Sequence, residues 1–153
     1  MNAPIHYLED FLVGQRWISE PLTVSAEEIK EFAARFDPQI FHLDAIAAED
    51  TFFQGLAASG WHTAALSMRL LVGCGMKPAG GTIGAGVDEL KWPLPVRPGD
   101  TLHVVVEVLE VKPSRSRPDI GIVRVRMQTL NQDDKVVQSC IANVVAASRQ
   151  GQT

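Results

Sequence analysis

An acid and an imidazole five positions apart, Asp37 and His42, are the residues of this 153-residue chain best suited to chemistry. The imidazole of histidine takes up and releases a proton near neutral pH, because its unperturbed pKa is about 6.5. A carboxylate beside it can hold a water molecule or share the proton transfer. Pro38 fixes a turn between the two residues, so the loop can bring both side chains to one side. This pattern indicates acid–base chemistry on a bound water.

The same two residue types also occur for purely structural reasons. Asp37 could be a polar group at the end of a helix, and His42 could be a histidine whose hydrogen bonds are satisfied inside the fold. Residue types alone favour this structural explanation. The catalytic interpretation therefore depends on what the rest of the chain builds around the pair.

The elements that position this pair begin with a helix predicted from Ser25 to about Phe36. Ser25 and Glu28 have the spacing of a capping box, and apolar residues recur behind them at helical intervals. The helix is expected to stop at Asp37, because Pro38 disfavours a helical conformation in the residue before it. A weaker helix over 45–50 is predicted next, with Asp44 as its N-cap.

A third helix is predicted from Trp61 to about Val72, capped by Ser59 and Gly60. Apolar residues surround most of its circumference, which is typical of a helix buried in the centre of a domain. The second half of the chain predicts antiparallel strands. A flexible glycine-rich connection over 80–86 is expected to lead into strands at Val87–Trp92, Thr101–Val111, Ile122–Leu130 and Val136–Ala147.

Helices that precede antiparallel strands favour an α+β fold over a doubly wound sheet. A long apolar helix needs a covering, and a curved antiparallel sheet wrapped around it is the hotdog fold. The sequence therefore predicts a single hotdog domain over residues 1–147, followed by a disordered tail over 148–153. Thr101–Val111 is rich in Val and Leu and is expected to be buried on much of both faces.

The overall charge excludes some classes of partner. The net charge is −4 and no run of Lys or Arg stands out, so neither nucleic acid nor a membrane surface is expected as a partner. The four histidines have no metal-ligand spacing, so no metal is expected. The beginning of the sequence lacks the features of a signal peptide, and Cys74 and Cys140 are expected to be reduced thiols. These observations predict a cytoplasmic protein.

Four stretches together resemble a known family. Residues 37–44 read Asp-Pro-Gln-Ile-Phe-His-Leu-Asp, which is similar to the signature of the MaoC-like dehydratases and R-specific enoyl-CoA hydratases. Residues 58–61, Ala-Ser-Gly-Trp, stand where that family begins its central helix. Residues 90–100 resemble its next strand and turn, and residues 114–119 resemble a loop of many members. The resemblance extends from roughly Gly14 to Ala147.

The resemblance implies an enzyme, a hydro-lyase that adds water across the double bond of a 2-enoyl thioester or removes it. Asp37 and His42 match the catalytic pair of the family, and Gly60 matches the glycine whose N–H faces the thioester oxygen. The substrate would be an acyl group on coenzyme A or acyl carrier protein. No separate cofactor is implied, because coenzyme A is part of the substrate. Hotdog domains pair through their sheets, so a homodimer or a multiple of it is expected.

Three positions depart from the family pattern, whose commoner signature is Asp-x-Asn-Pro-x-His. Pro38 directly follows the acid, Gln39 stands where Asn is usual, and Ser59 occupies a position that is often His. These departures leave the acyl group open. We expect substrate contacts from a set of residues that includes two of these three positions: Gln39, Ser59, Trp61, Trp92, Arg115 and Arg117.

Some of these residues have alternative explanations. The two tryptophans could equally be core or interface residues, and the two arginines could belong to a solvated loop and not to a site for carrier phosphates. His62 is expected to pack near the site and not to act as a second base. Two other functions also stay open. One is a hotdog thioesterase, against which the position of His42 argues, and the other is a non-catalytic module that binds acyl thioesters.

Overall fold

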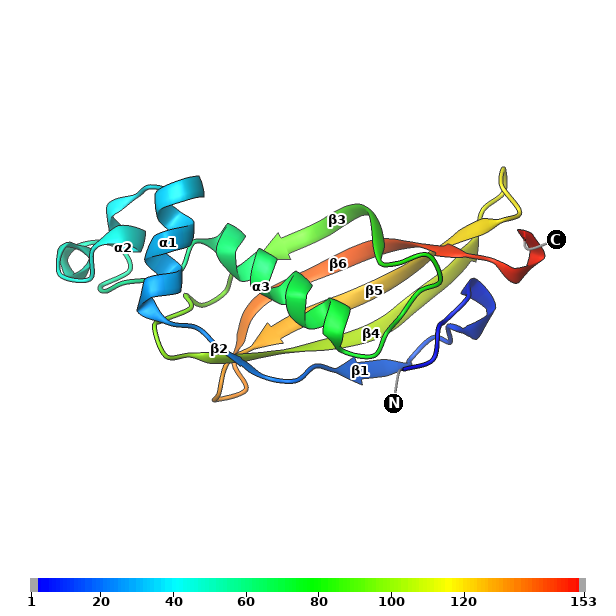
Figure 1. The fold of residues 1–153 in the computed structure, drawn as a ribbon, viewed down its shortest axis with the longest axis horizontal. Coiled ribbons are helices and arrows are strands. Elements are labelled where there is room, and N and C mark those ends of the chain that lie inside the picture. Colours follow the sequence, from blue (N-terminus) through cyan, green and yellow to red (C-terminus); the bar gives the residue numbers. More distant parts are fainter. Residues whose placement is uncertain (1–2, 152–153) are drawn as a thin grey trace.

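A single antiparallel sheet organises the computed structural model, which describes residues 3–151 (Figure 1). The strands lie in the order β1-β4-β5-β6-β3, with β2 paired to β4 near its start. Their bounds are β1 (Arg16–Ile18), β2 (Leu22–Thr23), β3 (Ile83–Lys91), β4 (Thr101–Pro113), β5 (Ile120–Leu130) and β6 (Val136–Ala147). The helices are α1 (Ala26–Phe36), α2 (Ile40–Leu43) and α3 (Gly60–Gly73).

The hydrophobic core lies between α3 and one face of this sheet. On β4 the buried side chains alternate with partly exposed ones, and Val104, Val106 and Val108 are all on the covered face. Leu66, Leu70 and others on one side of α3 belong to the same cluster of buried residues. The long helix on a curved antiparallel sheet is the predicted hotdog arrangement, and the α+β class is confirmed. The expectation that β4 is buried on both faces is wrong, because helices cover only one.

The central helix is also less enclosed than its composition predicts. One stripe of α3 faces the sheet, but Trp61, Met68 and Val72 on another side are 61%, 41% and 52% exposed. Nothing in the described part of the chain covers this second stripe. Apolar composition alone does not tell which side of a helix meets the sheet of its own chain.

Most element boundaries agree with the prediction. Helix α1 begins after Ser25, whose Oγ accepts a hydrogen bond from the N–H of Glu28 at 3.1 Å. Two short elements differ. The helix expected over 45–50 is a single 3-10 turn at Ala47–Asp50, and α2 was not predicted. The glycine-rich connection is shorter than expected, because β3 already begins at Ile83.

The end of the chain is held against its beginning. Ser148 is buried, its hydroxyl donates to the carboxylate of Glu9, and its N–H donates to the carbonyl of Asp119 at 2.8 Å. The guanidinium of Arg149 pairs with Asp10. Residues 148–151 therefore differ from the disorder predicted for the tail, and residues 152–153 lie outside the described part.

Candidate active site

The junction of α1 and α2 positions the acid and the imidazole. Asp37 is the C-cap of α1, and its N–H donates to the carbonyl of Ala33 at 2.9 Å. Pro38 prevents α1 from continuing, and the chain turns so that Gln39 N–H donates to the Asp37 carbonyl at 2.7 Å. Helix α2 starts at the next residue, and His42 lies within it. The two side chains thus come from two helices that meet at a fixed turn.

The carboxylate and the imidazole face each other. Oδ2 of Asp37 lies 3.3 Å from Nε2 of His42, and their side chains are 18% and 5% exposed. Nδ1 of His42 lies 2.6 Å from the carbonyl oxygen of Ala57. Because a carbonyl only accepts, Nδ1 must carry a proton in this contact. A neutral His42 therefore presents the lone pair of Nε2 toward Asp37.

The surroundings of Asp37 favour its ionised form. Burial alone raises its pKa, but hydrogen bonds from Gln39 and Ser59, together with the charge that His42 carries when it is protonated, lower the pKa of Asp37 below its ordinary value. Nε2 of Gln39 donates to Oδ1 at 2.5 Å. Asp37 is therefore a carboxylate at neutral pH, with Oδ2 left to face His42.

The start of α3 forms a second part of the site. The hydroxyl of the N-cap Ser59 accepts from the N–H of Trp61 at 3.3 Å, and Gly60 follows it as the first helical residue. The indole of Trp92 packs directly on Gly60, where a Cβ atom would lie 2.7 Å from the ring. Nε1 of Trp92 donates to Oε1 of the buried Gln138 at 2.9 Å, which fixes the ring over the helix start.

A cavity of about 550 Å³ joins these parts. His42 and Gly60 both line it, whereas Asp37 is in contact with His42 but is not a lining residue. Most of the wall is apolar and comes from the loop before α3 and the segment after β3. The lining residues are His42, Phe52, Phe53, Gln54, Ala58, Gly60, Thr63, Trp92, Pro93, Leu94, Pro95, Val96 and Arg97.

The part of the chain that builds this site matches a known protein family. The family described as the MaoC like domain matches residues 12–131, which include both helices of the acid–base pair and the start of α3. The chain belongs to the MaoC-like domain family. YdeM of Bacillus subtilis, an uncharacterized protein, is 35% identical over 127 residues, which are 83% of this chain and 89% of that protein.

Solved structures support the same assignment of this MaoC-like chain. A MaoC-like dehydratase from Rhodospirillum rubrum is 56% identical, with a TM-score of 0.90 over 94% of this chain and 98% of the other. The unliganded R-hydratase PhaJ1 from Pseudomonas aeruginosa is 30% identical, with a TM-score of 0.74 over 93% and 86%. The hotdog fold is thereby confirmed, and hydratases and dehydratases are the class of enzyme to which the chain is similar.

The structure of this MaoC-like domain brings six of the predicted site residues together. Asp37, His42 and Gln39 form one cluster, and Gly60, Ser59 and Trp92 form the other side. Trp61 contacts Trp92 edge-on, at 5.3 Å between ring centroids, but does not line the cavity. His62 points elsewhere and stacks on Phe32 of α1, at 4.7 Å between ring centroids.

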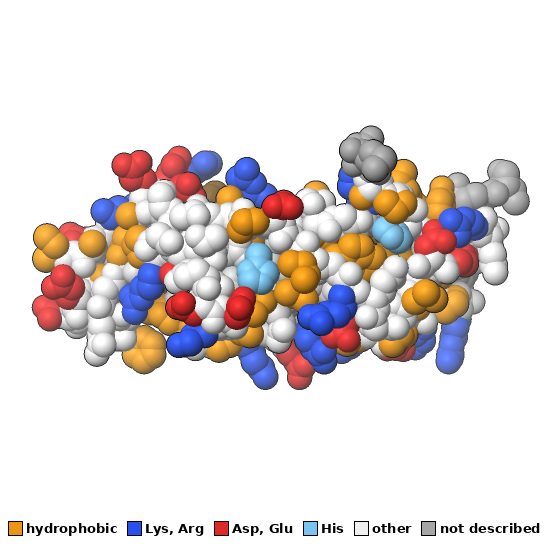
Figure 2. All heavy atoms as spheres, turned by 90° about the horizontal axis from the view of Figure 1, so that it is seen from below, with side chains coloured by type: hydrophobic (Ala, Val, Ile, Leu, Met, Phe, Trp, Pro, Cys, Tyr) orange, Lys and Arg blue, Asp and Glu red, His pale blue; other side chains and the backbone are white. Residues whose placement is uncertain are grey.

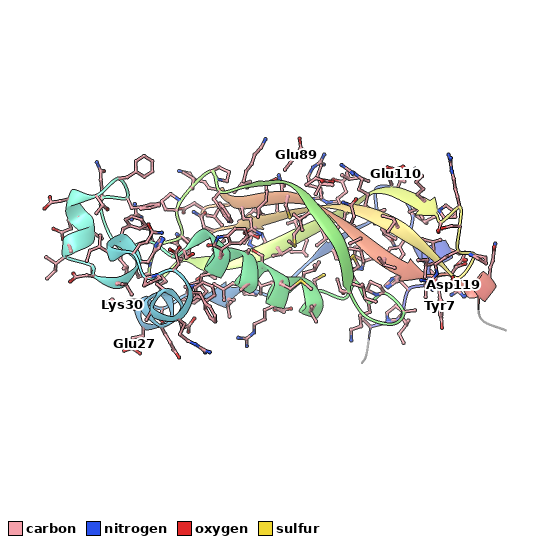
Figure 3. All side chains as sticks on the ribbon, turned by 90° about the horizontal axis from the view of Figure 1, so that it is seen from above. Tyr7, Glu27, Lys30, Glu89, Glu110 and Asp119 are labelled. Atoms are coloured by element: carbon pink, nitrogen blue, oxygen red, sulfur yellow. The ribbon has the colours of Figure 1, made fainter. Side chains whose placement is uncertain are left out.

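Arg115 and Arg117 do not reach this cavity. Both lie in the hairpin between β4 and β5, where Arg117 pairs with Asp119 at 2.6 Å. Figure 3 shows Asp119 at one end of the molecule and Glu27 and Lys30 of α1 at the other. Within one chain, the full length of the sheet separates this loop from the acid–base pair.

Three residues of the site were not predicted from the sequence. Ala57 supplies the carbonyl that fixes the tautomer of His42, and only the tertiary fold brings it there. Gln138 gave a detectable signal, because it is one of the few polar residues inside a largely apolar predicted strand, and in the structure it is only 1% exposed. Arg97 lies in the stretch 90–100 that resembles the family, just before residues 98–100, and its side chain lines the cavity.

Neither a metal site nor a membrane span is found in the described part of the chain. Between residues 3 and 151, no three His, Cys, Asp or Glu side chains lie close enough together to hold an ion. No helix in this range has both the length and the hydropathy that crossing a bilayer requires. Figure 2 shows acidic and basic side chains interspersed on one face of the molecule, with no extended patch of one sign there.

Proposed function

We propose that this MaoC-like domain catalyses the reversible addition of water to a 2-enoyl thioester carried by coenzyme A or acyl carrier protein. One observation carries the proposal. Nε2 of His42 lies 3.3 Å from Oδ2 of Asp37, and His42 lines a cavity to which the first residue of α3 also contributes. Membership of the family and the similarity to an R-hydratase support the same reaction class.

The pair is suited to activating one water molecule. Asp37 Oδ2 and the neutral His42 Nε2 are both acceptors, so a water bound between them donates a hydrogen to each. Loss of one proton to the pair makes the water oxygen a nucleophile toward C3 of the substrate. The contact from Nδ1 of His42 to Ala57 keeps the ring in this orientation throughout.

Gly60 supplies the electrostatic part of the proposal. The N–H groups in the first turn of a helix have no partner within that helix, and the helix dipole adds positive potential there. Addition at C3 moves negative charge onto the thioester oxygen, and the N–H of Gly60 would stabilise it as an enolate. The acid–base pair then returns a proton to C2, so that one water is added in total. Dehydration follows the same steps backwards and needs no separate cofactor.

Replacement of either member of the pair tests the proposal. Asp37→Asn and His42→Ala are each expected to lower the hydration rate of crotonyl-CoA by roughly 10²–10⁴-fold, the usual contribution of a positioned acid or base. The measurement is the loss of enoyl absorbance, with circular dichroism and the melting temperature to show that the fold is retained. Turnover at the wild-type rate in a folded variant would rule out the assigned roles.

The same assay separates the two alternative functions. A thioesterase would release free thiol, so a thiol-reactive dye is read beside the enoyl absorbance on the same samples. A non-catalytic module would bind acyl-CoA without changing either signal, and its affinity would not depend on Asp37 or His42. Loss of absorbance without thiol release is the result expected of a hydratase.

We also propose that the functional unit is a homodimer formed through β3. This strand is at one edge of the sheet, and Ile83 and Val87 on it are 51% and 56% exposed. The uncovered stripe of α3 with Met68 and Val72 adds apolar surface. An exposed edge with apolar side chains is a template for pairing with a second strand, and a second copy of the chain offers the same edge. Sedimentation velocity should give a dimer, and Val87→Asp should shift it toward monomer.

A further inference from the structure

The guanidinium of Arg97 lines the same cavity as His42 and Gly60, and the acid–base scheme does not use it. Arg97 lies directly after the buried Val96 and before the turn at residues 98–100 that leads into β4. Its side chain is half-buried and reaches across to the loop that precedes α3. A cation at this place in a substrate cavity calls for an explanation.

The hydrogen-bond partners of this guanidinium are neutral. Nη1 donates to the carbonyl of Leu56 at 3.3 Å, and Nη2 donates to the carbonyl of Phe53. Asp100 accepts from the backbone N–H of Arg97 at 2.8 Å, but its carboxylate forms no ion pair with the guanidinium. Across residues 3–151 the arginines that form ion pairs are others, namely Arg117, Arg124, Arg126 and Arg149. Carbonyl contacts orient the charge of Arg97 without neutralising it.

The cavity strengthens the field of this charge. No carboxylate occurs among the described residues that line it, and most of the wall consists of Phe, Trp, Pro, Leu and Val side chains. Charges interact more strongly beside apolar walls than in open water, because the effective dielectric constant there is lower. A guanidinium also has five N–H donors in a planar fork, of which the two carbonyls use two. Donors therefore remain for an anionic group in the cavity.

The position of Arg97 relates it to the reacting centre. The carbonyl that it contacts belongs to Phe53, and the ring of Phe53 lies 5.8 Å from the ring of His42, measured between centroids. A thioester placed between His42 and Gly60 would therefore have Arg97 on the Phe53 side of the same cavity.

We propose that Arg97 binds an anionic oxygen group of the substrate and so determines which thioesters the enzyme accepts. This inference rests on the proposed function and deepens it. The group is either a carboxylate on the acyl chain or a phosphate of the carrier, since a guanidinium recognises both through the same paired N–H donors. Arg97 thereby combines two tasks, because its carbonyl contacts also tie the loop at Phe53 to the segment before β4.

Binding of unreactive, saturated thioesters tests this proposal without requiring turnover. Calorimetry would compare three ligands. Glutaryl-CoA carries both an acyl carboxylate and the carrier phosphates, valeryl-CoA carries only the phosphates, and valeryl-pantetheine carries neither. The affinity of each ligand is measured for wild type, Arg97→Gln, Arg97→Lys and the control Arg16→Gln. The control changes an exposed arginine on β1, which is the edge strand opposite β3.

Arg97→Gln is expected to weaken at least one anionic ligand about tenfold or more relative to valeryl-pantetheine, with Arg97→Lys in between and Arg16→Gln unchanged. An effect on glutaryl-CoA alone identifies the acyl carboxylate, and an equal effect on both CoA esters identifies the phosphates. Equal weakening of all three ligands would mean that Arg97 only holds the loop at Phe53 in place. No weakening of any ligand would mean that Arg97 does not contact the substrate. Either result overturns the inference. If charge-dependent binding is found without any hydration, the proposed reaction fails while the role of Arg97 holds.

Discussion

Gly60 and Trp92 are packed so closely that a Cβ atom on the glycine would lie 2.7 Å from Cε2 of the indole. The glycine is therefore required for close approach and not for an unusual backbone conformation. The indole cannot move away freely, because its Nε1 donates to the buried Gln138 at 2.9 Å. This contact joins the start of α3 to the segment after β3, and both belong to the cavity wall.

Gly60→Ala should lower the hydration rate by roughly 10²–10³-fold, the usual cost of losing an oxyanion donor, because the new methyl group displaces either the indole or the helix start. Stopped-flow or steady-state hydration of crotonyl-CoA measures it. Gly73→Ala at the other end of α3 is the matched control, since a Cβ there meets nothing within 4 Å. The double variant Gly60→Ala/Trp92→Ala should recover part of the rate. Equal rates in Gly60→Ala and Gly73→Ala would refute the close-approach argument.

Gln39→Leu should raise the pKa of Asp37. The amide of Gln39 donates to Oδ1 of the ionised carboxylate at 2.5 Å, so its removal leaves the effect of burial less opposed. Titration of the Asp37 carboxyl carbon by NMR measures the shift, and the other carboxyl resonances serve as the internal control. A pKa that stays in place, or falls, would contradict the role assigned to Gln39.

The sign of the linked effect on stability follows. Because the pKa of Asp37 is lowered in the folded state, its ionisation stabilises the fold above the ordinary value of 3.8, and this contribution is lost as the pH falls through the lowered pKa. Gln39→Leu removes part of this stabilisation by ionised Asp37. Urea denaturation should therefore show a smaller stability difference between wild type and Gln39→Leu at low pH than at neutral pH.

Gln138→Leu should weaken substrate binding without unfolding the protein. The substitution suits the apolar core around β6 but leaves the indole N–H of Trp92 without its acceptor. The indole should become more mobile over Gly60, so that KM rises and tryptophan fluorescence anisotropy falls. Gln138→Glu, which keeps an acceptor at the same position, is the comparison. Unchanged KM and anisotropy in Gln138→Leu would show that the contact does not fix the ring.

Ser25→Ala should destabilise the fold by about 1 kcal/mol through loss of the N-cap of α1. The hydroxyl of Ser25 accepts from the N–H of Glu28 at 3.1 Å, and α1 ends at Asp37. Urea denaturation measures the cost, and Ser25→Asp should retain most of the stability, since a carboxylate also caps a helix start. A loss in Ser25→Asp equal to that in Ser25→Ala would show that capping is not the cause.

Local chemistry explains why several elements could be predicted from the sequence. Helix α1 has a serine cap at its start and a proline after its end, and strands β5 and β6 alternate or are rich in apolar residues over their whole length. These signals depend on neighbours within a few residues. Helix α2 was missed because its four residues carry no periodic pattern, although it holds His42.

The sequence by itself determined the α+β class and the resemblance to the MaoC-like family, and through that resemblance it led to the proposal of Asp37 and His42 as an acid–base pair, because these depend on residue type and short spacing. Only the tertiary structure decided that Ala57 fixes the tautomer of His42, that Gln138 holds Trp92, and that Arg97 faces the cavity. It also decided that the hairpin between β4 and β5, which contains Arg115 and Asp119, does not reach the cavity of its own chain. Contacts between residues distant in sequence depend on how helices pack on the sheet, and no local pattern specifies that packing.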